Sequence, residues 1–566
     1  MRLDKLWIKR FKNLSEVEID FSEGDWVTVV IGWNGTGKSN VLEALVLIFR
    51  DLDLGKPKPP FAYKLEYRCR GQRIAIDADP DRIGEPYIIR VYESDPDTMQ
   101  KSAAPEQVPL FTSAEHNSAA PPGQDIKYSR FRQEKNKYLP NYVFGYYSGP
   151  SNRLERHFDE HQKRFYDDLL AGEDSPMRPL FYARPIHSQF VLLAFMLKQD
   201  DAVQGFLSDY LGIDPNGGID SVLFVLHNKP SWAKKKTDPT GKGDKRFWFA
   251  RGVVQRFLDR LYEISLAPIR LNHKVTLDFR RKETNEHLYL FVRDTESLRT
   301  LLNDLPPHEF FKELESTYIS ELIAEVRIRV KLSKNAGAVE FRELSEGEQQ
   351  LLTVLGLLRF TAEQESLFLL DEPDTHLNPR WAMDYLEFLE KFVGTDEQTR
   401  KSSHVVLTTH NPLAIAALNA KQVQILTREP DSQKVAASRP SIDPRGMGFA
   451  GILTSDMFGL PATVDKPTLK LLEDQRKIAA KGESLSEEDK KELEKLNAQL
   501  ESLGFRFEMR DPVFTEYLKL RHELLEAEVG TEGAGARTLD KSNPRAMELI
   551  KRAVERAKER ARKEQK

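Results

Sequence analysis

The feature that most constrains the fold of this chain is a glycine-rich segment near its N-terminus. Residues 26–31 (WVTVVI) form an apolar run typical of a buried strand, residues 32–39 read GWNGTGKS, and an apolar helical pattern follows at once. A GxxxxGKS motif between a strand and a helix is typical of a phosphate-binding loop. Its glycines let backbone N–H groups close around phosphates, and the helix directs the positive end of its dipole at them. The predicted nucleotide-binding residues are Asn34, Gly35, Thr36, Gly37, Lys38, Ser39 and Asn40.

A second apolar strand pattern lies far downstream and ends in two carboxylates. Residues 366–373 read SLFLLDEP, and a third apolar run, residues 404–409, leads to His410. In such a site Lys38 contacts the β- and γ-phosphates, while the Ser39 hydroxyl and Asp371 hold Mg²⁺. Glu372 is then placed to polarise the attacking water. These motifs predict an α/β fold with ATP and Mg²⁺ as its cofactors.

Residues 344–350, LSEGEQQ, stand about twenty residues before the carboxylate pair and precede another helical pattern. Taken alone, Ser345 and Glu348 form a capping box at a helix N-terminus, and His410 is an ordinary histidine at the end of a strand. The order and spacing of these segments beside a phosphate loop favour a shared site instead.

Together the motifs resemble those of ABC-type ATPases of the SMC-like branch, the group that includes DNA-repair and overcoming-lysogenization-defect ATPases. Residues 6–14 (LWIKRFKNL) resemble the first strand and turn of that branch, and LSEGEQ resembles the signature LSGGQ, with Glu346 in place of the first glycine. Residues 374–379 (DTHLNP) occupy the D-loop position. The resemblance covers roughly the first 50 residues and residues 340–412. It implies an ABC-type head, a P-loop NTPase fold with a mixed sheet and flanking helices.

The resemblance also implies that two copies of the chain share their sites. Ser345, Gly347 and Glu348 would complete the site of a facing copy, in a homodimer or a higher even-numbered oligomer. The γ-phosphate would then be the contact that distinguishes the open from the closed dimer. Asp374 and His376 belong to the D-loop.

His410 takes the position of the switch histidine and joins Glu372 as a catalytic residue. Heads of this type also carry a Q-loop glutamine that senses the γ-phosphate. Gln189 is the first candidate and Gln162 the second, and for each the alternative is an ordinary surface glutamine.

Composition favours a globular protein of the cytoplasm. The chain has 566 residues, a formal net charge of −4 and 30% charged residues. No apolar run approaches the ~18 residues required to span a bilayer, and the first residues lead into a strand rather than a signal sequence. The single cysteine, Cys69, excludes an internal disulfide and a cysteine-based zinc site. We therefore expect no membrane partner.

The motifs divide the chain into four parts. Residues 1–150 form the N-terminal half of the head, and residues 336–430 form its C-terminal half. Residues 151–335 contain no sustained heptad pattern, which predicts a compact, mainly helical insertion rather than a coiled-coil arm. Three strand-like runs in it, at residues 271–275, 288–292 and 326–332, are assigned to the second part of the head. A basic loop is either solvated or contacts phosphates; it contains Lys234, Lys235, Lys236, Lys242, Lys245 and Arg246.

Residues 431–566 are predicted to form a mostly helical extension that binds a partner. Residues 451–461 (GILTSDMFGLP) resemble the C-terminal extension of the ATPase subunit of Septu anti-phage systems, which also occurs beside certain retron reverse transcriptases. In those families the ATPase works with a separate HNH-type nuclease. No Toprim pattern of a strand-end glutamate with an Asp-x-Asp follows the head, so we expect no intrinsic nuclease. The basic tail, residues 551–563, is either a solvated terminus or a docking segment.

These features favour a regulatory ATPase that controls a partner nuclease. The alternative is a DNA-repair or recombination ATPase of the SMC-like type that binds DNA directly. Nucleic acid (msDNA, DNA or tRNA) stays open as a further partner. A subunit of a membrane transporter is disfavoured, because Lys38 and Ser345 are separated by about 307 residues.

Overall fold

The computed structural model describes the parts of the chain that form the head, the insertion and the start of the extension. The described residues are 1–22, 26–93, 123–174, 177–197, 199–215, 217–228, 241, 243–276, 282–302, 305–332, 337–361, 365–393, 402–429, 434–482 and 485–505. They belong to two compact units, Met1–Gly459 and Leu460–Lys566. The basic tail and residues 234–236 and 242 of the basic loop lie outside the described residues. The other two residues of that loop, Lys245 and Arg246, lie in the short helix η5 (Lys245–Phe247), where Arg246 forms ion pairs with Asp244 and Asp259.

The first unit begins with an antiparallel sheet in the order β2-β1-β4-β5-β6-β7. Its strands are β1 (Arg2–Phe11), β2 (Leu14–Asp20), β4 (Tyr63–Cys69), β5 (Gln72–Ala78), β6 (Tyr87–Glu93) and β7 (Gln124–Ile126). Buried and exposed residues alternate along β4, β5 and β6, as expected where one sheet face meets the core and the other meets solvent. Cys69 is the buried last residue of β4.

The second sheet carries the nucleotide motifs, in the order β18-β17-β3-β16-β15-β8-β9. Its strands are β3 (Val27–Gly32), β8 (Tyr142–Tyr147), β9 (Leu180–Tyr182), β15 (Ser366–Asp371), β16 (Ser403–Thr408), β17 (Val423–Arg428) and β18 (Val435–Ser438). All pairs are parallel except β17 with β18. The predicted mixed sheet is confirmed, and the chain returns to it through β8.

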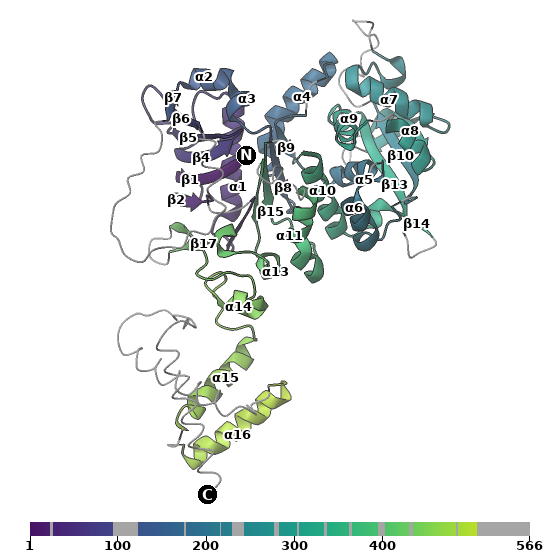
Figure 1. Ribbon diagram of the computed structural model, residues 1–566. Helices are drawn as coiled ribbons and strands as arrows, with labels where there is room; N and C mark the ends of the chain where they lie inside the picture. Colours follow the sequence, from purple (N-terminus) through teal and green to yellow (C-terminus); the bar gives the residue numbers. More distant parts are fainter. Residues whose placement is uncertain are drawn as a thin grey trace. The chain divides into compact units, whose positions relative to one another are not determined.

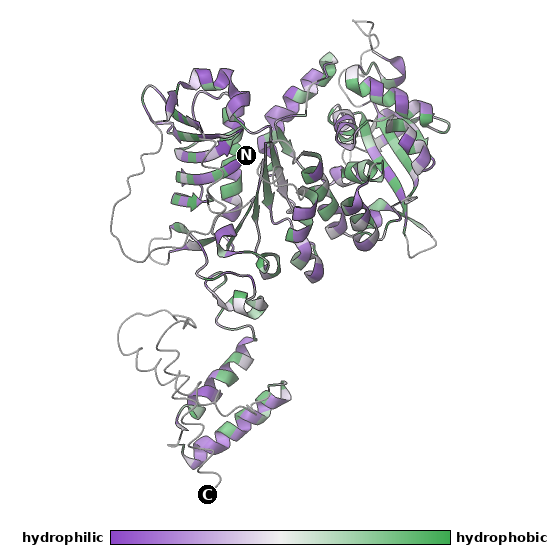
Figure 2. Ribbon diagram, in the orientation of Figure 1, coloured by the Kyte–Doolittle hydropathy of each residue, from purple (hydrophilic) through white to green (hydrophobic). Residues whose placement is uncertain are grey.

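Helices cover both faces of this sheet. Helix α1 (Lys38–Leu54) lies between the first and second sheets (Figure 1) and contacts β3, β8, β15 and β16. Along β15, Leu367 and Leu369 join the core around α1, whereas Phe368 and Leu370 join a second core. That second core includes α5 (Ile186–Leu197), α10 (Glu346–Thr361) and α11 (Pro379–Val393). Both faces are thus buried, which explains the continuous apolar run of β15 and its green colour in Figure 2.

The insertion contains a third sheet, in the order β11-β12-β10-β13-β14. Its antiparallel strands are β10 (Ile219–His227), β11 (Ile269–Thr276), β12 (Lys282–Val292), β13 (Ile323–Lys331) and β14 (Ala338–Glu340). Three helices contact it, α7 (Gly252–Ile264), α8 (Thr295–Leu302) and α9 (Pro307–Ile319).

Residues 151–335 contain more helix than strand, as predicted, but the prediction that their three strand-like runs return to the head is wrong. The three runs at 271–275, 288–292 and 326–332 do form strands, but β10 pairs with both β12 and β13. The runs find partners in each other, so they form a sheet of their own rather than edges of the head sheet.

Several shorter helices complete the first unit. They are α2 (Tyr128–Gln133), α3 (Lys135–Tyr138), α4 (Asp159–Ala171), α6 (Asp201–Gly205), α13 (Pro412–Ile415) and α14 (Gly448–Thr454). Since β18 belongs to the head sheet and α14 to the first unit, this unit continues past residue 430, the predicted end of the head.

The second unit contains α15 (Lys466–Ala479) and α16 (Glu487–Ser502), which contact each other. The predicted helices of the extension are confirmed here, and the Ser486 side chain caps α16. Among the helices described in both units, none has the length and apolar character required to cross a bilayer.

Candidate functional site

The phosphate loop, residues 32–39, connects β3 to α1 in a conformation that depends on glycine. Gly32, Gly35 and Gly37 have φ values of +150°, +84° and +101°. A Cβ on Gly37 would lie 2.8 Å from both Asn13 Oδ1 and Leu14 Cδ2, so no larger residue fits without a shift of its neighbours. Gly37 is the N-cap of α1 and has no side chain to cap it. The first N–H groups of α1 are thereby left for a phosphate.

Polar side chains from two other segments hold the loop in place. Asn13, in the turn after β1, donates to the Gly35 carbonyl at 2.8 Å and accepts a hydrogen bond from Asn40 at 2.6 Å. Arg428, at the end of β17, donates to the same carbonyl at 2.9 Å. Within the loop, the Thr36 hydroxyl donates to a backbone carbonyl at 2.9 Å. Asn34 is exposed. The first strand and its turn therefore support the loop directly.

Lys38 lies between the loop and the carboxylates. Its Nζ donates to the Gly32 carbonyl at 2.8 Å, and the side chain is buried. Burial lowers the pKa of Lys38, and the nearby charges of Glu372 and Asp371 oppose this effect. A buried cation at this position favours a polyanionic ligand.

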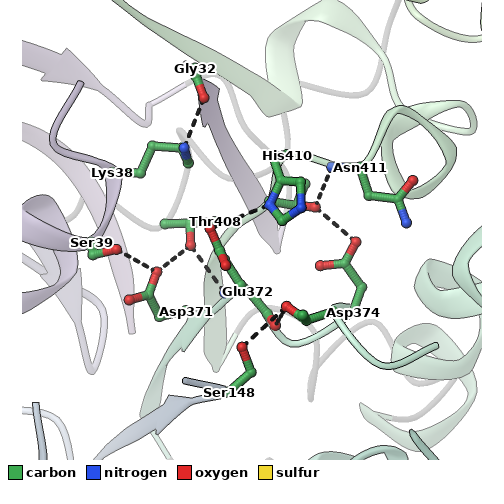
Figure 3. Close-up of polar contacts among 12 residues, drawn as sticks. Gly32, Lys38, Ser39, Ser148, Asp371, Glu372, Asp374, Thr408, His410 and Asn411 are labelled. Carbon is green, nitrogen blue, oxygen red and sulfur yellow. Dashed lines mark hydrogen bonds and ion pairs between the residues drawn. The ribbon is translucent and has the colours of Figure 1, made fainter. Parts of the chain in front are cut away.

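Asp371 is the centre of the polar contacts in Figure 3. Its Oδ1 accepts hydrogen bonds from the Ser39 hydroxyl at 2.9 Å and the Thr408 hydroxyl at 2.6 Å. These residues meet because β3, β16 and β15 are parallel neighbours whose carboxyl ends share one edge of the sheet. Within the described parts of the chain, no group of three or more metal-binding side chains occurs. A Mg²⁺ ion held by one carboxylate, one hydroxyl and phosphate oxygens requires no such group, so Ser39 and Asp371 fit this metal.

Glu372 and His410 face each other beside Asp371. The Glu372 Oε1 lies 3.4 Å from His410 Nδ1, and both side chains are partly exposed. Glu372 has a φ of +52°, which is unusual for a residue with a side chain. Its N–H donates to the Thr408 carbonyl at 3.0 Å, which stabilises this backbone conformation. The pair can thus hold a water molecule at the edge of the metal site.

The signature segment, residues 344–350, forms a capping box at the start of α10. The Ser345 N–H donates to Glu348 Oε2 at 2.6 Å, and the Glu348 N–H donates to Ser345 Oγ at 3.3 Å. Ser345 is exposed, whereas Gly347 is buried. Among the described residues, no hydrogen bond joins this segment to the phosphate loop. Its role in a facing copy remains a prediction.

The signature segment packs directly against the D-loop, residues 374–379. A Cβ on Gly347 would lie 2.4 Å from the carbonyl oxygen of His376, so the two backbones are in contact. Asp374 is buried, which raises its pKa, and it accepts a hydrogen bond from the Thr409 hydroxyl at 2.8 Å. The D-loop is therefore fixed between the signature segment and the residue before His410.

Neither glutamine proposed for the Q-loop is joined to this site by a hydrogen bond within the described structure. Gln189 is buried in α5, a helix in contact with α9 and α10, and its Oε1 lacks a partner among the described residues. Gln162, in α4, accepts a hydrogen bond from Arg184 at 2.7 Å. The γ-phosphate-sensing glutamine remains a prediction.

Sequence reasoning missed Arg153 and Ser148, in the segment that follows β8. Arg153 forms an ion pair with Asp371 Oδ2 at 2.6 Å, and its guanidinium lies 4.6 Å from the ring centroid of Tyr147. Ser148 donates its N–H to the Asp371 carbonyl at 3.2 Å, and its hydroxyl is 3.2 Å from that of Thr375. The signal that locates them is the pairing of β8 with β15, because a parallel neighbour of β15 must end at the same edge of the sheet.

Comparisons with known proteins agree with this geometry. Residues 1–170 match the family model described as "AAA ATPase domain", and residues 223–416 match "AAA domain, putative AbiEii toxin, Type IV TA system". Septu protein PtuA from Bacillus mycoides (strain KBAB4) is 25% identical over 276 residues. That match covers 45% of this chain but only 37% of the relative's length.

Two solved SMC heads also align with the chain. The SMC head bound to the C-winged helix domain of ScpA covers 78% of this chain and 98% of its own, at 11% identity and a TM-score of 0.31. The Smc head domain with an extended coiled coil, bound to the C-terminal domain of ScpA from Pyrococcus furiosus, covers 77% and 96%, at 14% identity and a TM-score of 0.27. By the family matches and the curated relative, this chain is similar to AAA-type ATPases and resembles the Septu protein PtuA.

Proposed function

We propose that this chain binds and hydrolyses ATP as the regulatory subunit of an anti-phage defence complex in the cytoplasm. The observation that carries the proposal is the meeting of Lys38, Ser39, Asp371, Glu372 and His410 at one edge of the second sheet. The similarity to the Septu protein PtuA supports the assignment to defence.

Each residue at this edge has a distinct task in hydrolysis. The first N–H groups of α1 and the Lys38 ammonium bind the phosphates. Ser39 and Asp371 hold Mg²⁺, which supplies charge neutralisation to the phosphate oxygens when it is bound. Glu372 accepts a hydrogen bond from the attacking water and His410 orients the Glu372 carboxylate.

Head dimerisation would connect ATP to regulation. Ser345 is exposed at the start of α10, and Glu348 fixes its position through the capping box. A facing copy could therefore contact Ser345 without rearrangement of the helix, and two bound ATP molecules would join the copies in a two-fold dimer. The second unit would bind the separate HNH-type nuclease, since it makes up most of the predicted partner-binding extension, residues 431–566.

ATP binding is tested first, with a fluorescent ATP analogue. Lys38→Ala should abolish binding, because it removes the buried cation. Lys9→Ala removes a half-exposed lysine of β1 and should leave binding unchanged. Equal binding by both variants would contradict the assignment of the phosphate loop.

The partner is tested by co-purification with the product of the neighbouring gene, which we expect to be an HNH-type nuclease. Full-length protein should retain the nuclease, whereas a chain that ends at Gly459, the end of the first unit, should lose it while it still binds ATP. Purified full-length protein should cleave neither DNA nor RNA. Mg²⁺-dependent cleavage that survives Glu372→Gln would instead reveal a nuclease within this chain.

A further inference from the structure

One face of the third sheet carries rings and cations that the ATPase chemistry does not use. Helices α7, α8 and α9 contact this sheet, and the apolar side chains of β13 at Val326, Ile328 and Val330 are buried. The intervening residues of β13 point to the other face. Residues directly opposite each other on neighbouring strands share a face. The pairs on this second face include Leu223 with Phe291 and Arg327, Val225 with Tyr289 and Glu325, and His227 with His287.

On the same face, a continuous ring cluster across β10, β11 and β12 consists of His227, His273, His287 and Tyr289. The ring centroids of His227 and His287 are 5.8 Å apart, and those of His287 and His273 are 5.2 Å apart. Tyr289 lies 5.9 Å from His273 and donates or accepts a hydrogen bond with its Nε2 at 2.8 Å. His273 is exposed and Tyr289 half-buried, so the cluster offers π-faces to solvent.

Cations lie beside the ring cluster along β13. Arg327, Arg329 and Lys331 occupy alternate positions of the strand, with side chains that are 50%, 55% and 55% exposed. Their spacing along the strand is about 6.6 Å, twice the rise per residue. A row of exposed cations at regular spacing suits a polymer with regularly spaced negative charges.

The carboxylates on this face do not neutralise the cations. Glu325 is shared by Arg327 at 2.8 Å and Arg342 at 2.6 Å. Asp220 lies 3.9 Å from both Arg329 and Lys331. Each of these two carboxylates thus serves two cations, and Glu340, opposite Arg329, adds a third negative charge. Together with Lys274 of the cavity lining, the residues named here are five cations and three carboxylates, in a chain whose net charge is −4.

Rings and cations meet in a cavity of about 480 Å³. Its polar lining comes from His273, His287, Tyr289, Lys274, Arg327 and Arg342, together with Glu325. The histidines do not form a metal site with each other or with any other described residue. An aromatic ring with phosphate groups attached fits this combination, since the rings can stack on a base while the guanidinium groups pair with phosphate oxygens.

We propose that this ring-and-arginine face binds single-stranded nucleic acid. The bases would stack against Tyr289 and His273, and the backbone phosphates would follow Arg327, Arg329 and Lys331. A single strand is favoured over a duplex because only unpaired bases expose a face to the rings. It is favoured over an acidic peptide because carboxylate side chains would leave the ring cluster without a partner.

The position of this face connects it to the signature segment. Arg342 lines the cavity and stands three residues before Ser345, after the short strand β14. A nucleic-acid strand bound at Arg342 would therefore lie next to the signature segment, residues 344–350, at the start of α10. Binding itself does not depend on ATP hydrolysis, so a failure of the ATPase proposal and a failure of this one are distinguishable.

The test is fluorescence anisotropy with the full-length chain and a labelled single-stranded DNA of about 20 nucleotides. Arg327→Glu combined with Arg329→Glu should weaken binding at least about tenfold, and should reduce the slope of log affinity against log salt by about 1.4, or about 0.7 per lost phosphate contact. Tyr289→Leu should weaken binding about tenfold, whereas Tyr289→Phe, which keeps the ring, should not. Retained binding of the ATP analogue shows that each variant is folded.

Arg73→Glu is the matched control. Arg73 is also an exposed strand arginine paired with a glutamate, Glu66, and stacked on a tyrosine, but it lies in the first sheet. An equal loss of binding in this variant would mean general charge attraction and would overturn the proposal. So would duplex binding that is as tight as single-strand binding and insensitive to Tyr289→Leu, or binding of a polyglutamate peptide without binding of DNA or RNA. A preference for RNA over DNA of the same sequence, or the reverse, supports it.

Discussion

Glu43 provides a quantitative test of how the segments around the phosphate loop are held together. It lies in α1, and its side chain is only 3% exposed. One carboxylate oxygen is 2.9 Å from His157 Nε2 and 3.6 Å from Arg156, while the other contacts the Lys12 ammonium. Lys12 belongs to the turn after β1, and the other two partners follow Arg153. A single carboxylate therefore joins three segments that border the ATP site.

The contribution of the Glu43 carboxylate to the free energy of unfolding follows from its pKa. Burial by itself would raise this pKa, but the hydrogen bonds from His157 and Lys12 outweigh burial and lower it from 4.5 to about 2. A decrease of this size corresponds to about 3.4 kcal/mol in favour of the charged form, at about 1.36 kcal/mol for each pH unit. Because the pKa is lower in the folded than in the unfolded state, this stabilisation is fully present above pH 4.5. It is lost as the pH falls towards 2.

Glu43→Gln should accordingly lower the free energy of unfolding by about 2–3 kcal/mol at pH 7, since the amide keeps the volume but not the charge. Urea unfolding followed by tryptophan fluorescence measures the difference. Glu160→Gln is the control, because Glu160 is 49% exposed and its ion pair with Lys56 at 2.9 Å should contribute less than about 1 kcal/mol. The reasoning is refuted if the wild type and Glu43→Gln differ equally at every pH from 7 down to 3.

Three further predictions concern the nucleotide. Glu372→Gln should keep ATP binding but slow phosphate release by about 10²-fold or more; wild-type turnover would remove Glu372 from its role. A mixture of Lys38→Ala and Ser345→Arg proteins should regain part of the ATPase activity, because hybrid dimers contain one intact shared site; a mixture as inactive as each parent would exclude shared sites. Arg153→Met should tighten Mg²⁺-dependent binding of an ATP analogue several-fold, since the guanidinium and the metal compete for Asp371; an unchanged Mg²⁺ titration would contradict this competition.

Each of these experiments has a matched control in the same chain. Glu387→Gln alters a carboxylate of α11 that is 61% exposed and should not affect turnover. Lys38→Ala mixed with a Lys38→Ala/Ser345→Arg double variant contains no intact shared site and should stay inactive. Arg164→Met removes an exposed arginine of α4 and should leave the Mg²⁺ titration unchanged.

The central strands of the head and its ATP site could be predicted because their signals are local in sequence. The glycine spacing of the phosphate loop and the apolar runs that end at Asp371 and His410 are visible in short windows. The strands β3, β15 and β16 lie where the apolar runs at residues 26–31, 366–373 and 404–409 predict them. Strands of a parallel sheet end at one edge, so their terminal residues meet whatever the intervening chain does.

Long-range pairing accounts for what the sequence did not show. The strand β10 pairs with β13, about a hundred residues later, and no local pattern specifies that choice over the edge of the head sheet. Arg153 was missed for a related reason, because its partner Asp371 lies 218 residues away. At Ser345 the local structure was predicted but the function was not decided. Both interpretations of its motif, a capping box alone and a signature for a facing copy, predict the same capped start of α10.

The contact between Gly347 and His376 has a consequence for the proposed dimer, in which two copies of the chain would share their sites. The surface around Ser345 that a facing copy would touch and the loop that fixes Asp374 beside the hydrolytic residues are backbone neighbours. If a facing copy displaced α10 by even a few tenths of an ångström, it would also displace the residues proposed to hydrolyse the ATP bound by the copy to which α10 belongs. The two active sites of such a dimer would not act independently, because nucleotide binding at one site would shift residues at the other. The chain would then respond to the number of occupied sites rather than to each site alone.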